Sequence, residues 1–232
     1  MRRDGCTFAS PVHSPRKRWR SGCTARGRQD TCDVEARERA AFIAEARTWL
    51  GTPFRDQGDV KGKSGAVDCA MLLVRSAQAC GLIDPAFDPR PYPPQWHLHR
   101  DEERFLDVIG RLVAARGRGG EIPNEAGLPA EALAKPGDVI VWRVGRCFSH
   151  GGIIVEATPS TPDRDPGEAA EHQDLQVLHA YYKTGHVAIS PLVEVELVLL
   201  PDGRPRPFKL YGLWAKFCER RTRPAVRFTM RQ

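Results

Sequence analysis

The stretch that decides the fold of this 232-residue chain is residues 66–74, which read Ala66-Val67-Asp68-Cys69-Ala70-Met71-Leu72-Leu73-Val74. Its apolar residues fit a helix from Asp68 to Cys80 that stops at Gly81. Asp68 suits the N-cap position, because its carboxylate can accept backbone N–H groups of the first turn. Cys69 would then begin the helix, where those N–H groups and the helix dipole favour a thiolate over a thiol. The stretch therefore predicts a reactive cysteine with a lowered pKa.

A first amphipathic helix is predicted upstream, from Val34 to Leu50, because apolar residues recur there at intervals of three and four. The motif Gly51-Thr52-Pro53-Phe54 ends it, since glycine suits the cap and proline prevents continuation. The loop 55–65 contains three glycines and belongs on the surface, where it could wrap around a substrate. A further helix is predicted from Arg100 to Ala115, after a proline-rich segment.

Antiparallel strands are predicted after the turn Lys135-Pro136-Gly137-Asp138. The runs that carry this prediction are Val139–Val144, Ile153–Val155, Leu175–Leu178, Val187–Ile189 and Val193–Leu200. A polar, acidic loop lies at 157–174, and the last thirty residues add one more strand or short helix. Helices first and an antiparallel sheet afterwards predict an α+β fold.

The charge of the chain is concentrated at its ends. The formal net charge is +6, made up of +4 in residues 1–36, −5 in residues 37–200 and +7 in residues 201–232. Because the basic excess lies in the tails and not on a motif-bearing element, we expect no specific nucleic-acid partner. We expect a disordered basic extension over 1–35, one domain over 36–218 with an insertion at 84–135, and a basic tail over 219–232.

Neither export nor metal binding is indicated. No apolar run follows the N-terminal arginines and none is long enough to span a membrane, so we expect synthesis in the cytoplasm without a signal peptide. The seven cysteines have no CxxC spacing, and His97-Leu98-His99 has no further ligand nearby. We therefore expect no metal and no cofactor, with His97 and His99 in a structural or substrate-rim role.

Two histidines complete a candidate catalytic set. His150 lies in Phe148-Ser149-His150-Gly151-Gly152-Ile153-Ile154-Val155, and His179 lies in Val177-Leu178-His179-Ala180. A cysteine peptidase needs a thiol within reach of an imidazole that a third polar group orients. In an antiparallel sheet packed on the helix, both histidines could lie above Cys69. Cys147 is a rival nucleophile, but it falls within a strand pair and not at a helix terminus.

The order of these motifs resembles the NlpC-type family of papain-like cell-wall peptidases over roughly residues 37–217. The resemblance implies a papain-like domain in which N-terminal helices pack on an antiparallel β-sheet. It also implies a cysteine endopeptidase that hydrolyses peptidoglycan stem peptides, commonly between D-glutamate and diaminopimelate. In its terms Cys69 is the nucleophile, His150 the general base and His179 the orienting residue, and substrate contacts fall at Phe54, Asp68 and Trp96.

The segment 88–99 further resembles the branch of this family found in phage tails and gene-transfer agents. The resemblance implies tail proteins as partners and delivery in a phage-like particle that acts in the periplasm. Three positions depart from the family pattern: Phe54 replaces a tyrosine, so a hydroxyl is lost, and Ala70 and Met71 follow Cys69 in place of serine and glycine. Asp68 is either only a helix cap or also a contact for the substrate amine.

Two other functions remain open at the level of sequence. A thiol domain of this kind could act as an acyltransferase or amidase on a small molecule, because a fold does not fix its substrate. The chain could also be a non-catalytic tail-tip assembly component that interacts through residues 85–120 and its basic termini. Such a scaffold would be expected to lose the cysteine or a histidine, and all three are present.

Overall fold

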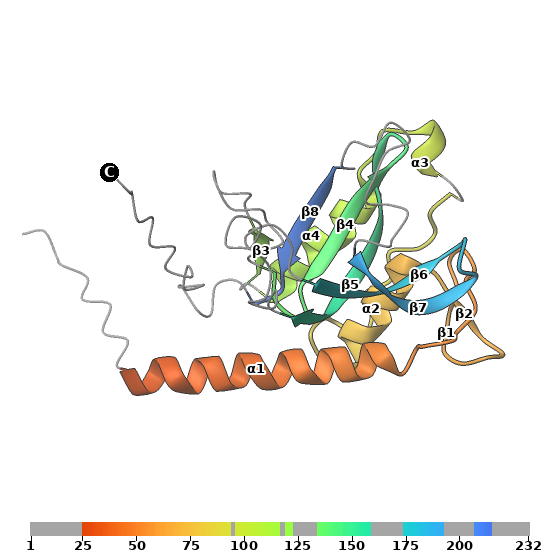
Figure 1. Ribbon diagram of the computed structural model, residues 1–232. Coiled ribbons are helices and arrows are strands. Elements are labelled where there is room, and N and C mark those ends of the chain that lie inside the picture. The colour runs from red at the N-terminus through yellow and green to blue at the C-terminus, as the bar shows by residue number, and fades with distance from the viewer. Residues whose placement is uncertain are drawn as a thin grey trace, which may run out of the picture.

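Six strands form one antiparallel sheet, and the longer helices cover one of its faces (Figure 1). The computed structural model describes residues 25–93, 96–116, 119–122, 134–158, 174–192 and 207–214. The order of the strands in the sheet is β3-β8-β4-β5-β6-β7, and a separate two-stranded hairpin pairs β1 with β2. The fold is α+β, as the sequence predicts.

The helices are α1 (Ala25–Arg47), α2 (Cys69–Ala79), α3 (Trp96–His99) and α4 (Arg104–Arg116). The strands are β1 (Asp59–Val60), β2 (Ala66–Val67), β3 (Gly120–Ile122), β4 (Val139–Val144), β5 (Cys147–Thr158), β6 (Asp174–Tyr181), β7 (His186–Pro191) and β8 (Phe208–Gly212). The predicted strand Val193–Leu200, most of the acidic loop 157–174, the tail 219–232 and residues 1–24 lie outside the described residues.

Helix α1 begins at Ala25, well before the predicted start at Val34. The helix thus includes residues 25–35, which are expected from the sequence to lie in the basic N-terminal extension. Residues 25–35 read Ala-Arg-Gly-Arg-Gln-Asp-Thr-Cys-Asp-Val-Glu, a polar run without apolar periodicity, so the sequence carries no amphipathic signal for a helix there. The second half of the helix packs on the core through Phe42 and Ala46, which are fully buried.

A buried ion cluster joins α1 to the start of β4. The Arg39 guanidinium donates through Nε to Glu35 Oε1 and through Nη1 to Asp138 Oδ1, each at 2.8 Å. Asp138 also accepts the backbone N–H of Lys135 at 2.9 Å, and Arg39 lies over the Trp214 ring. The predicted turn at residues 135–138 is thus a structural anchor that ties the first helix to the sheet.

Two apolar layers lie on the two faces of the sheet. The layer beneath α1, α2 and α4 includes Val139, Val141 and Ile153, whereas Ile140 and Trp142 belong to the opposite layer. The alternation along β4 is what a strand covered on both faces requires. No helix within the described residues is long and apolar enough to cross a membrane.

Candidate active site

A cavity of about 370 Å³ opens at the start of α2. Cys69 and His150 line it together, and its walls come from the segment before α2, the proline-rich segment, α3 and the end of β6. Phe54 and Asp68, two of the predicted substrate contacts, also line it. The structure therefore brings together predicted site residues as far apart in the sequence as Phe54 and His150, which are separated by 96 positions.

The sheet register places the two histidines next to each other, with their rings in an edge-on arrangement. The β5–β6 ladder starts at Ile153 opposite Leu178 and runs toward Thr158. His150 and His179 lie just beyond the start of this ladder, where His150 Nε2 is 3.3 Å from His179 Nδ1. Gly152 allows the approach, because a Cβ there would come within 2.5 Å of the Val177 side chain and 3.2 Å of His179 Cβ.

The His150 imidazole is held in an aromatic setting that the sequence did not reveal. Its ring stacks on Trp142 with the ring centroids 5.7 Å apart. The ring centroid of Tyr181 lies 5.0 Å from that of His150. Trp142 is the direct partner of His150 in the β4–β5 ladder, so pairing register alone creates the contact. Burial lowers the pKa of His150 well below 6.5, and the charges of His179 and His97 lower it further.

The Cys69 thiol is half-buried at the first residue of α2. Its Sγ lies 3.9 Å from the Ser149 carbonyl oxygen, to which it donates, and it makes no hydrogen bond to an imidazole within the described ranges. Burial raises the pKa of Cys69, and the adjacent Asp68 carboxylate raises it further. Backbone N–H groups of Gly151, Ala70 and Cys69 itself oppose this rise.

The predicted lowering of the thiol pKa is thus wrong in direction. The helix N-terminus does present N–H groups to the sulfur, but desolvation outweighs them. Burial favours the neutral forms of both Cys69 and His150. A neutral thiol and a neutral imidazole are therefore favoured over a thiolate and an imidazolium.

Asp68 is the N-cap of α2, and both of its carboxylate oxygens accept hydrogen bonds. Its Oδ1 accepts the Met71 backbone N–H at 2.8 Å, and its Oδ2 accepts the Gln57 backbone N–H at 2.7 Å and the Tyr92 hydroxyl at 2.5 Å. Burial raises the pKa of Asp68, while these hydrogen bonds act to lower it. With three donors already engaged, Asp68 acts first as a hub that joins α2 to two neighbouring segments.

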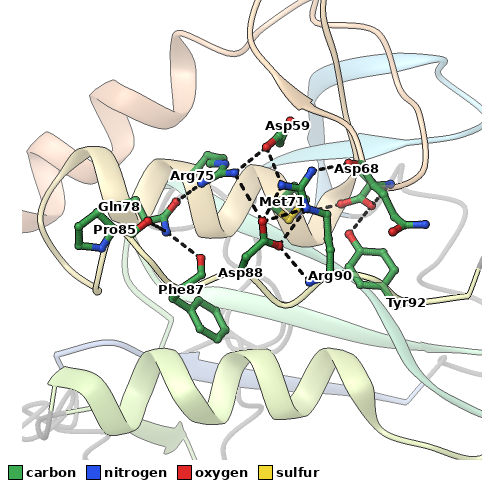
Figure 2. Close-up of polar contacts among 11 residues, drawn as sticks. Asp59, Asp68, Met71, Arg75, Gln78, Pro85, Phe87, Asp88, Arg90 and Tyr92 are labelled. Carbon is green, nitrogen blue, oxygen red and sulfur yellow. Dashed lines mark hydrogen bonds and ion pairs between the residues drawn. The ribbon is translucent and has the colours of Figure 1, made fainter.

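Tyr92 is a site residue that sequence reasoning missed. It comes from the proline-rich segment, it is buried, and it lines the cavity beside Asp68 (Figure 2). Its contact spans 24 positions and leaves no periodic signal in the sequence. Because Phe54 and Tyr92 share the cavity, an aromatic hydroxyl is present there although residue 54 lacks one.

An ion-pair network holds the segment that carries Tyr92. Arg90 pairs with Asp88 at 2.6 Å and with Asp59 at 2.9 Å, and it donates to the Gln57 carbonyl oxygen at 3.0 Å (Figure 2). Arg75 of α2 reaches the same Asp59 at 2.5 Å. The Arg90 hydrogen bond lowers the pKa of Asp88 to about 2, so the network stays charged across the neutral range.

The remaining predicted residues take different places. Trp96 is the first residue of α3, and its side chain lies outside what the structure describes. His97 lines the cavity, and burial lowers its pKa. Cys147 is buried and does not line the cavity. Among the described residues, no group of three or more His, Cys, Asp or Glu side chains is placed to hold a metal ion.

The buried histidines predict loss of stability in acid. Burial lowers the pKa of His179 to about 4, whereas an unfolded histidine titrates near 6.5. The unfolded chain therefore binds the proton first, and the free energy of unfolding should fall as pH drops from 6.5 to about 4. At pH 4.5 His179 alone accounts for about 2 to 3 kcal/mol, with His150 adding to it.

Urea unfolding of the wild type and His179→Gln at pH 7 and pH 4.5 measures this effect. The variant should lose less stability than the wild type on acidification. An equal loss in both proteins would show that His179 does not contribute.

Comparisons with known proteins give weak structural likenesses. No family model matches the chain and no curated protein matches it. Two solved structures of an N-acetylmuramoyl-L-alanine amidase from Bacteroides uniformis are similar to it at 12% and 13% identity, with TM-scores of 0.43 and 0.39. Each similarity covers 75% of this chain and 98% of the amidase chain.

A Bacteroides fragilis protein provisionally described as a xylanase is similar at 16% identity, with a TM-score of 0.30, over 72% of this chain and 99% of its own. Likenesses this distant do not assign an activity to the chain.

Proposed function

We propose that this chain is a papain-like cysteine endopeptidase of the NlpC type that hydrolyses peptidoglycan stem peptides, at the bond between D-glutamate and diaminopimelate. One observation carries the proposal: Cys69 at the start of α2 and His150 line one cavity, and His150 is hydrogen-bonded to His179. The motif order around these residues supports the NlpC assignment, and the phage-tail resemblance of 88–99 supports delivery of the enzyme in a phage-like particle.

The reaction begins with proton transfer from the thiol. Nε2 of His150 faces His179, so Nδ1 is the nitrogen left to accept the Cys69 proton. As the sulfur attacks the peptide carbonyl carbon, the S–C bond forms and the carbonyl electrons move to oxygen. The Cys69 backbone N–H at the helix N-terminus can donate to that oxyanion, and loss of such a donor typically slows the reaction about 10²- to 10³-fold.

His150 then acts as an acid and afterwards as a base. It returns its proton to the leaving amine as the C–N bond breaks, which leaves a thioester on Cys69. Water hydrolyses the thioester when His150 takes a proton from it. His179 accepts the Nε2–H of His150 and stabilises the imidazolium that forms between these steps.

Peptidoglycan digestion tests the proposal directly. Reduced protein and its Cys69→Ala variant are incubated with purified diaminopimelate-type peptidoglycan, and released fragments are identified by mass spectrometry. We expect new D-glutamate and diaminopimelate termini with the wild type and none with the variant. Intact stem peptides in both samples, from folded protein whose thiol reacts with iodoacetamide, would overturn the proposal and point to a small-molecule acyl substrate or a scaffold.

A further inference from the structure

We propose that Ser190 is a positioning residue that fixes the tautomer of His179 and, through it, the orientation of the protons on His150. The inference rests on the proposed role of His150 as the base for Cys69. Ser190 is half-buried in β7, and its Oγ lies 3.2 Å from His179 Nε2. It does not line the cavity, so it acts through the histidines and not on the substrate.

The register of β6 and β7 explains why this contact forms. His179 is the direct partner of Ala188, and Ser190 is two positions further along the same strand. Residues two apart share a face, so Ser190 is the diagonal neighbour of His179. The strand pairing therefore continues the line from the cavity through both histidines to Ser190.

The proton positions along this line are linked. His150 can accept the thiol proton on Nδ1 only if its own proton sits on Nε2. That N–H must then donate to an unprotonated His179 Nδ1, 3.3 Å away, which requires the His179 proton to be on Nε2. Ser190 Oγ is the group that accepts this proton, and no other described side chain is recorded within hydrogen-bond distance of His179 Nε2.

Without the Ser190 acceptor, the other tautomer becomes competitive. A His179 protonated on Nδ1 would donate to His150 Nε2, and the His150 proton would then occupy Nδ1. In that state His150 presents an N–H to Cys69 and cannot take its proton. Loss of a triad-type orienting group acts through the same kind of tautomer error.

Alkylation of Cys69 by iodoacetamide tests the inference without any peptidoglycan. Ser190→Ala should slow the reaction about 3- to 10-fold, the range that one neutral hydrogen bond allows, and Ser190→Thr should restore it because the hydroxyl is kept. In a His179→Ala background, Ser190→Ala should produce no further slowing. ¹⁵N spectra of the imidazoles should show the Nε2–H tautomer of His179 in the wild type and a larger Nδ1–H population in Ser190→Ala.

Two results would overturn the inference. The first is alkylation of Cys69 at the wild-type rate in Ser190→Ala, and the second is that Ser190→Ala slows alkylation as much in the His179→Ala background as in the wild type. The second would mean that Ser190 only supports the strand. If the variants show the expected alkylation pattern but the wild type does not cut peptidoglycan, the proposed substrate is wrong and the Ser190 inference still stands.

Discussion

Replacement of His150 by alanine is expected to slow the proposed stem-peptide hydrolysis by about 10²- to 10⁴-fold, the usual contribution of a general base. The reason lies in the resting charge state. Burial raises the pKa of Cys69, so thiolate is scarce unless a neighbouring group removes the proton as attack proceeds. His150 lines the cavity with this thiol and is hydrogen-bonded to His179.

The measurement compares kcat and the rate of Cys69 alkylation in wild type, His150→Ala and His150→Gln. The glutamine variant keeps most of the side-chain volume between Trp142 and Tyr181, so a loss in both variants reports chemistry and not a packing defect. His186→Gln is a matched control, because that histidine is exposed and does not line the cavity. Added imidazole should partly restore His150→Ala. Hydrolysis at the wild-type rate by both His150 variants would show that His150 takes no part in the reaction.

Local sequence signals predicted the elements that position Cys69. The start of α2 follows from Asp68 and the apolar run after Cys69, and its end follows from Gly81, which has a φ of +64°. The antiparallel pairing of β4 with β5, of β5 with β6 and of β6 with β7 follows from the strand runs. These features depend on neighbours in the chain, which a sequence displays.

Features that depend on distant contacts escaped prediction. β3, a strand of three residues that pairs with β8 across about ninety positions, was not predicted, whereas β8 lies in the last thirty residues, where a strand or short helix was expected. The Tyr92–Asp68 contact, the Trp142 stack on His150 and the Ser190 contact arise from register or from a proline-rich path. The direction of the thiol pKa was missed for the same reason, because burial is a property of the whole fold.

Replacement of Asp68 by alanine is expected to lower the free energy of unfolding by about 3 kcal/mol or more. Loss of the N-cap alone costs about 1 kcal/mol. The change also removes the acceptor of the Tyr92 hydroxyl and of the Gln57 N–H, and each buried donor left unpaired costs about 1 to 3 kcal/mol. The loss of stability therefore reports the hub that joins α2 to both neighbouring segments.

Urea unfolding of a double-mutant cycle separates these contributions. Tyr92→Phe alone should cost about 1 kcal/mol, and in the Asp68→Ala background it should cost nothing or raise stability, because it removes the hydroxyl that Asp68→Ala leaves unpaired. Asp56→Ala is the matched control: this carboxylate lines the same cavity but is exposed, so its removal should change stability by no more than about 0.5 kcal/mol. Additive losses at Asp68 and Tyr92 would contradict the hub.

Asp68→Asn then distinguishes a cap from a charged contact for the substrate. The Asp68 carboxylate raises the pKa of Cys69, so removing its charge while keeping an oxygen acceptor should lower that pKa and speed alkylation near neutral pH. A pure cap leaves KM for the stem peptide unchanged in this variant. If the carboxylate binds the substrate amine, Asp68→Asn should instead raise KM, even though the thiol itself has become more reactive. Slower alkylation by Asp68→Asn would contradict the charge effect and leave orientation of α2 as the reason for any lost activity.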